Sequence, residues 1–90
     1  MLVVVETHYD PPIDVPKLMQ IDPFLDSCMR EHGIEWKGSL LSRDGRRSIC
    51  QFEAPDAETL RQAFHRSQQP FASIWAAECV FVPLNYKLHV

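Results

Sequence analysis

The sequence has no apolar run near the ~18 residues that a membrane-spanning helix needs, so we expect no membrane partner. It also lacks a basic excess, because nine Lys and Arg stand against twelve Asp and Glu, for a net charge of −3. A mildly acidic chain is poorly suited to grip a phosphate backbone, so we expect no nucleic-acid partner. The first residues lack a basic segment followed by a long apolar stretch. We therefore expect no secretory signal and a cytoplasmic protein.

Cysteine is scarce, and the three cysteines form an odd set without close spacing. We expect reduced thiols rather than the denser, even-numbered set of a secreted disulfide scaffold. The chain contains no CxxC, HExxH, GxGxxG or P-loop motif, no internal repeat and no nucleophile elbow. What is present is an ordinary globular composition over 90 residues, 46% of them hydrophobic. We expect one domain at residues 1–83 and a C-terminal tail at 84–90.

Strand and helix signals alternate along the chain. Strands are expected at residues 2–8, 34–42, 46–54 and 73–82, where β-branched or alternating residues are bounded by turn formers. Helical periodicity covers residues 13–32, and a second helix follows the N-cap Asp56. Pro23 interrupts the first helical region, so we expect two collinear pieces with one shared buried face, the second capped by Asp22; a kink is the alternative. This order predicts an α+β, ferredoxin-like β-α-β-β-α-β fold, with a four-stranded antiparallel sheet and two helices on one face.

The dipeptide Asp44-Gly45 favours a two-residue type I′ turn between the two middle strands. Such a turn places Ser39 opposite Cys50, Leu40 opposite Ile49, and Trp36 opposite Glu53. Opposed residues share a face of the sheet, and a one-residue slip would exchange the faces.

This register sorts the strands into two faces. The face expected to meet the helices carries Val3, Val5, Cys50, Phe52, Trp75, Ala77, Cys79 and Phe81. The open face is expected to carry Leu2, Val4, Glu6, His8, Trp36, Leu40, Ile49, Glu53, Glu78 and Val80. An exposed apolar patch of that size favours burial against a second copy, so we expect a homodimer packed sheet to sheet, a dimeric α/β-barrel type of assembly.

Several short motifs carry a family resemblance. They are Gly33-Ile34-x-Trp36, Ser39, Ser42-x-Asp44-Gly45 and Cys50-x-Phe52-Glu53-Ala54-Pro55-Asp56. They resemble a family of small proteins catalogued as a domain of unknown function, some of whose members are called nickel-binding proteins. The resemblance covers nearly the whole chain and implies a ferredoxin-like fold, a dimer and, for some members, nickel binding.

The first candidate site is an acidic and imidazole set on the open face. Glu6 and His8 lie two residues apart on a strand and point the same way, and Glu53 is expected one strand over. Carboxylate and imidazole ligands suit divalent transition ions such as nickel, so these three residues are the predicted metal ligands, with Glu78 as a further candidate. The alternative is that the carboxylates pair with neighbouring basic side chains such as Arg47.

Three further residues are secondary candidates. Cys50 is a metal ligand if the register is wrong, and otherwise a small core residue. Trp36 lines a pocket for a flat ligand or fills an interface. His65, beside two arginines on the second helix, is expected in solvent.

Three functions remain in competition from the sequence alone. The leading one is a small dimeric binding protein without catalytic activity that binds a divalent transition metal such as nickel. The second is a cofactor-free isomerase or monooxygenase, with His8 and Glu53 as acid and base in a pocket lined by Trp36. The third is a structural or regulatory interaction module.

Overall fold

The computed structural model describes residues 1–83, and the tail predicted at 84–90 lies outside them. Four strands and three helices follow one another along the chain. They are β1 (Leu2–His8), α1 (Val15–Leu18), α2 (Pro23–Glu31), β2 (Glu35–Leu41), β3 (Arg47–Glu53), α3 (Ala57–Arg66) and β4 (Ser73–Ala77). None of the helices in this part of the chain is long and apolar enough to cross a membrane.

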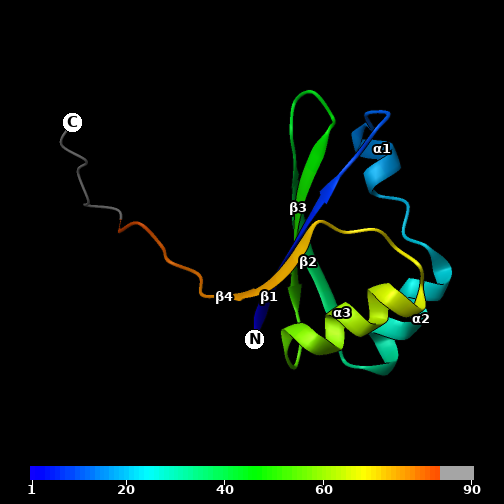
Figure 1. Ribbon diagram of the computed structural model, residues 1–90. Helices are drawn as coiled ribbons and strands as arrows, with labels where there is room; N and C mark the ends of the chain where they lie inside the picture. The colour runs from blue at the N-terminus through cyan, green and yellow to red at the C-terminus, as the bar shows by residue number, and fades with distance from the viewer. Residues whose placement is uncertain (84–90) are drawn as a thin grey trace.

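The strands form one antiparallel sheet in the order β2-β3-β1-β4. The first and third strands are therefore central, which is the usual strand order of the expected ferredoxin-like fold. Figure 1 shows the three helices on the same side of the sheet, and none of the helices in residues 1–83 covers its other side. We call the uncovered side the open face. The prediction of an α+β fold with helices on one face of a four-stranded antiparallel sheet is confirmed.

The core lies between the sheet and the two longer helices. Val3, Val5 and Phe52 are buried on the sheet side, and Leu60 and Phe64 of α3 are buried against them. The β-branched residues of β1 suit a strand with closely packed neighbours on both sides. The predicted inward direction of Val3, Val5 and Phe52 is confirmed.

The first helical region is split at Pro23, as expected. The Asp14 carboxylate accepts a hydrogen bond from the main-chain N–H of Lys17 (3.0 Å), and Asp22 accepts one from Leu25 N–H (2.9 Å). These two caps start two separate helices. The expectation of collinear pieces with one buried face is wrong, because α1 has no buried residue and Figure 1 shows it on a different axis from α2.

The turn between β2 and β3 differs in type from the prediction but keeps its register. Ser42 N–H donates to Arg47 O (2.9 Å), which leaves a four-residue loop, and Gly45 N–H donates to Ser42 O (2.9 Å) within it. In this loop Gly45 has a positive φ of 72° and Asp44 does not, so the turn is not type I′. The loop is longer than predicted by one residue from each strand, and this symmetric change leaves the pairing of the strands as it was. Ser39 therefore faces Cys50 and Leu40 faces Ile49, as predicted.

A β-bulge changes the position of Trp36. The register shifts between Trp36 and Gly38, and Trp36 pairs with Phe52 rather than with the predicted Glu53. One extra residue in a strand breaks the alternation of its side chains, so residues on one side of the bulge face opposite to the direction expected from residues on the other side. Trp36 therefore lies on the helix side, and its predicted place on the open face is wrong.

The last strand is shorter than predicted and has the opposite facing. It ends at Ala77, which pairs with Leu2, the first residue of β1. Pairing beyond that point would need more of β1, so the prediction of a strand to residue 82 is wrong. Ile74 is buried opposite Val5, and Trp75 is half exposed opposite Val4 on the open face. Trp75 and Ala77 therefore do not face the helices as predicted.

Candidate functional site

The open face carries a contact between Glu6 and His8 at the end of β1. His8 Nε2 lies 2.6 Å from Glu6 Oε2, and Arg47 Nη2 lies 3.4 Å from the other carboxylate oxygen. The His8 side chain is 62% exposed and that of Glu6 is 26% exposed. One nitrogen and one oxygen donor thus lie side by side where solvent reaches both. The predicted common direction of Glu6 and His8 is confirmed.

The neighbours of Glu6 favour its charged form. The hydrogen bond from His8 lowers the pKa of Glu6 from its ordinary value of 4.5, and the Arg47 guanidinium lowers the pKa further. Partial loss of surrounding water acts in the opposite direction. Glu6 is therefore a carboxylate at neutral pH, which is the form that a metal ion binds.

Glu53 does not join this pair within one chain. It lies opposite Leu2, four residues along β1 from Glu6, or about 13 Å at ~3.3 Å per residue. Its carboxylate forms an ion pair with the amino group of Met1. Among residues 1–83, no group of three or more His, Cys, Asp and Glu lies close enough to hold a metal ion. The same separation places His8 and Glu53 at opposite ends of the strand pair, which removes the predicted acid–base cleft between them.

The two other acidic and imidazole candidates lie elsewhere. Glu78 follows the end of β4 in an exposed segment, so it is not a member of the open sheet face as predicted. His65 is exposed on α3, as expected, and its ring lies edge-on to Phe71 with centroids 5.4 Å apart. Neither residue is paired with Glu6 in the sheet, where the partners of Glu6 are Ile49 and Ser73.

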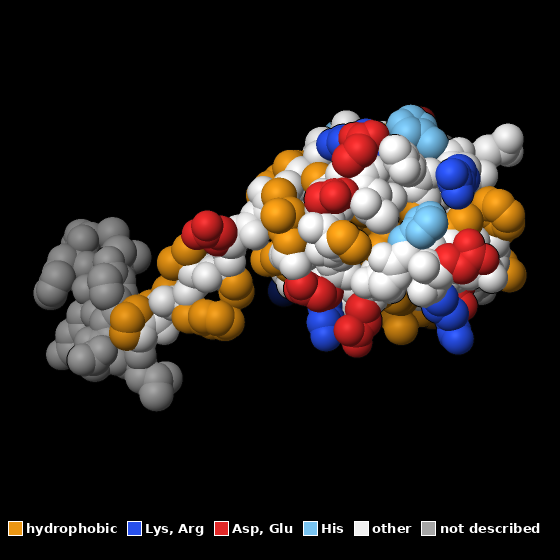
Figure 2. Space-filling model, turned by 90° about the horizontal axis from the view of Figure 1, so that it is seen from below, with side chains coloured by type: hydrophobic (Ala, Val, Ile, Leu, Met, Phe, Trp, Pro, Cys, Tyr) orange, Lys and Arg blue, Asp and Glu red, His pale blue; other side chains and the backbone are white. Residues whose placement is uncertain are grey.

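The open face also exposes apolar side chains. Leu40 is 65% exposed and Trp75 is 50% exposed; Leu40 pairs with Ile49, and Trp75 pairs with Val4. The chain then leaves the sheet on this side as an exposed arm, residues 78–83 (Figure 1). Val80, Phe81 and Val82 are 72–87% exposed along it, and Figure 2 shows hydrophobic side chains on this extension. An apolar face and an apolar arm held in water are features of an interaction surface.

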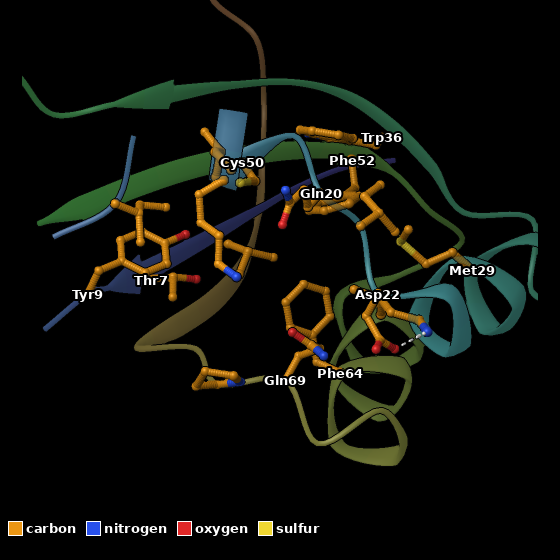
Figure 3. A pocket seen from close by; sticks show the side chains of 17 residues that line it. Thr7, Tyr9, Gln20, Asp22, Met29, Trp36, Cys50, Phe52, Phe64 and Gln69 are labelled. Atoms are coloured by element: carbon orange, nitrogen blue, oxygen red, sulfur yellow. Dashed lines mark hydrogen bonds between the residues drawn. The ribbon is translucent and has the colours of Figure 1, made fainter. Parts of the chain in front are cut away.

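A pocket lies on the opposite side of the sheet, between the strands and the helices. It has a volume of about 490 Å³ and brings together two of the secondary candidates, Trp36 and Cys50. Val5, Phe52 and Phe64 form much of its apolar lining, while α1 contributes Lys17 and the loop between α1 and α2 contributes Gln20 and Asp22. Figure 3 shows Cys50, Trp36 and Phe52 on one side of the space and Phe64 and Gln69 on the other.

A short polar chain lies at one end of this pocket. The Tyr9 hydroxyl is 2.7 Å from Ser48 Oγ, which is 3.9 Å from Cys50 Sγ. The sequence analysis missed this series of contacts between Tyr9, Ser48 and Cys50. It also missed Lys17, Gln20 and Gln69 as pocket residues. The alternation of β3 was a usable signal for Ser48 and Cys50. The others lie in or beside connecting segments, where no periodicity tells the direction of a side chain.

Comparison with known proteins supports the resemblance drawn from the motifs. A family model described as "Nickel responsive protein SCO4226-like" matches residues 4–76. The chain is also similar to the crystal structure of SCO4226 from Streptomyces coelicolor A3(2), with a TM-score of 0.74 and 12% identity over 90% of this chain and 100% of that one. At that identity the likeness shows the fold alone. No curated protein matches the chain.

Proposed function

The chain belongs to the SCO4226-like family of nickel-responsive proteins, and from that premise we propose that it is a cytoplasmic homodimer that binds a divalent transition metal such as nickel, without catalytic activity. The observation that carries this proposal is the Glu6–His8 contact of 2.6 Å on the open face. Imidazole nitrogen and carboxylate oxygen are donors that nickel accepts. A bound ion would replace their hydrogen bond with two metal–ligand bonds.

Two donors are too few to hold a transition metal ion firmly, so the remaining ligands come from water or from a second copy. Glu53 enters the proposed site only from a second copy, because in its own chain it lies at the other end of the strand pair. The apolar open face and the exposed arm support such a copy, since Leu40, Trp75 and Phe81 are large apolar side chains in solvent. Small chains commonly gain buried area by association.

Thermal unfolding against a panel of divalent ions tests the metal proposal. A ligand present at about 100 times its Kd stabilises the native state by ~2.7 kcal/mol, or on the order of 10 °C for a domain of this size. We expect nickel to raise the melting temperature by that order, and His8→Ala and Glu6→Ala to abolish the rise. His65→Ala is the matched control, because it removes an exposed imidazole from a site distant in the fold.

The Glu53→Ala variant distinguishes a metal site with ligands from two copies from a metal site built on one chain. Loss of the nickel response in this variant indicates ligands from two copies, whereas an unchanged response indicates a site built on Glu6 and His8 alone. A flat response of the wild-type protein to every ion in the panel would remove the metal proposal altogether.

A further inference from the structure

The pocket between the sheet and the helices is large for a domain of this size. Its volume of about 490 Å³ lies within the range of ~300–1,000 Å³ typical of small-molecule sites. The pocket is open to solvent and lined mainly by apolar side chains. A ligand with apolar surface would therefore gain contacts there as it displaces water.

Aromatic rings from three elements define the apolar part of the pocket. Phe52 and Phe64 meet edge to face, with centroids 6.0 Å apart and an interplanar angle of 86°. The Trp36 indole N–H donates to Ser39 Oγ (2.9 Å), which fixes the ring and leaves it no unpaired donor. Rigid aromatic surfaces of this kind favour another flat ring, in stacked or edge-to-face contact.

The polar part of the pocket comes from residues 13–22, the segment that includes α1 and leads into α2. In residues 1–83 the Lys17 ammonium group forms no ion pair, and the side-chain amide of Gln20 forms no hydrogen bond, whereas its main-chain N–H donates to Lys17 O (3.2 Å). The neighbouring carboxylate of Asp22 is already occupied as the cap of α2, accepting from Leu25 N–H at 2.9 Å. Donors are thus available at this end of the pocket, and the N-terminus of α2 partly balances the negative charge of Asp22.

This segment is held in place at both of its ends. Ile13 N–H donates to Gly45 O (2.9 Å), which anchors the start of the segment on the β2–β3 loop. Asp22 and the buried Leu25 fix its other end to α2. Lys17 and Gln20 are therefore positioned over the pocket by the fold.

We infer that this pocket binds a flat aromatic molecule with one anionic group, its ring among Trp36, Phe52 and Phe64 and its anionic group at Lys17 and Gln20. A charge-assisted hydrogen bond to an ammonium group gives such a ligand its orientation. The inference does not rest on the proposed metal site, because Glu6 and His8 lie on the other face of the sheet. Figure 3 shows the Gln20 side chain between the sheet residues and Phe64.

Two fluorescent probes with the same aromatic frame test the inference. The anionic probe is 8-anilinonaphthalene-1-sulfonate, and the neutral one is N-phenyl-1-naphthylamine. We expect one anionic probe to bind per chain, and Lys17→Gln to weaken its binding about tenfold, as for loss of a hydrogen bond to a charged group. The neutral probe should bind Lys17→Gln and wild type equally. Equal weakening of both probes would overturn the anionic end of the site.

Two substitutions on β3 locate the bound probe. Cys50→Met extends a longer side chain into the pocket and should weaken both probes, whereas Gln51→Met places the same side chain on the open face and should weaken neither. Trp75→Ala checks the exposed apolar surface. Loss of binding in Trp75→Ala with full binding in Cys50→Met would place the probe on the open face and overturn the inference.

Alkylation of the wild-type protein gives a test without any substitution in the core. Cys50 lines the pocket, and Cys79 is exposed outside it. Bound anionic probe should slow the reaction of iodoacetamide with Cys50 and leave Cys79 unchanged, as measured by mass spectrometry of peptides. Equal labelling rates at Cys50 with and without probe would also overturn the proposed site.

Discussion

Gly45 is a residue at which the β2–β3 loop lies against the segment before α1, because its main-chain oxygen accepts from Ile13 N–H (2.9 Å). A Cβ atom at this position would lie 2.2 Å from the main-chain oxygen of Ile13, and the backbone has φ of +72°. Gly33, after α2, has a similar φ of +67°, but a Cβ there would meet nothing within 4 Å. The two glycines therefore share a left-handed backbone and differ in the space around them.

This difference predicts unequal costs for two identical substitutions. Gly33→Ala should lower the free energy of unfolding by about 1–2 kcal/mol, the cost of a left-handed conformation for a residue with a Cβ. Gly45→Ala should cost more, because main-chain atoms of Ile13 must also move. Denaturant unfolding of both variants measures the comparison, and equal losses would contradict the close approach at Ile13.

Glu6 predicts a pH dependence of stability. Its native pKa is lowered from the ordinary 4.5 by the hydrogen bond from His8 and by Arg47. The contribution of a carboxylate with a lowered pKa is present above the unfolded-state pKa and is lost as the pH falls through the native value. Melting curves between about pH 6 and pH 3 should show Glu6→Gln less stable than wild type at the upper end, with the gap closing toward the lower end. A gap that is constant across this range would contradict the shift.

Arg47 makes a separate prediction for metal binding. Its guanidinium lies 3.4 Å from the carboxylate that is proposed to bind a cation. A neutral residue removes the repulsion between this charge and a divalent ion, which is strongest at low ionic strength. Arg47→Gln should therefore bind nickel several-fold more tightly than wild type at low salt, and calorimetric titration should show the difference shrink at high salt. Weaker binding by this variant would argue against metal at Glu6.

At the scale of the elements, the sequence predicted those helix starts and strand faces that depend on residues close together in the chain. Proline and aspartate placed the start of α2 correctly, and the pattern of β1 placed Val3 and Val5 in the core. The bulge before Gly38 was missed, although a glycine inside a strand often marks a bulge and Gly38 has a positive φ of 155°. One unpredicted bulge moved Trp36 from the open face to the pocket, and the pocket itself was consequently missed.

The N-cap residue of α2, Asp22, is expected to contribute to the stability of the fold. Asp22→Ala removes the acceptor for Leu25 N–H and should lower the free energy of unfolding by about 1 kcal/mol. Asp22→Ser should restore most of that loss. Asp26→Ala is the control within the same helix, because it leaves the cap in place and removes a first-turn charge together with an exposed pair with Arg30 (3.1 Å), the pair being worth about 0.3–0.5 kcal/mol. Chemical denaturation compares the three variants.

At the scale of the whole molecule, the sequence predicted strand order and layers better than the shape of its surfaces. Strand order follows from the sequence of elements and short connections, which leave few topologies. The length of β4 follows instead from where its partner β1 begins, which no pattern within residues 73–82 indicates. The exposed arm therefore appeared in the prediction as part of a strand.

The exposed open face predicts the effect of charge on assembly. Trp75→Glu places a carboxylate on that face and should shift the proposed dimer to monomer, because an unpaired charge is costly to bury. Phe24→Glu is the matched control: Phe24 is an exposed apolar residue, 57% accessible, on α2 on the other side of the sheet. Light scattering after size exclusion should report the mass of each. Monomeric wild-type protein would contradict the dimer, and dissociation by Phe24→Glu would place the interface on the helices.

The strict alternation of β3 has a consequence for how such a protein diverges. Cys50 and Phe52 line the inner pocket and Ser48 is buried on the same side, whereas Ile49, Gln51 and Glu53 shape the outer face. Substitutions at even-numbered positions can thus change what the interior accepts while the odd-numbered ones keep the outer surface intact, and the reverse holds equally. Two descendants of one ancestral chain could retain the same assembly and acquire different small-molecule preferences through changes confined to every second residue of a single strand.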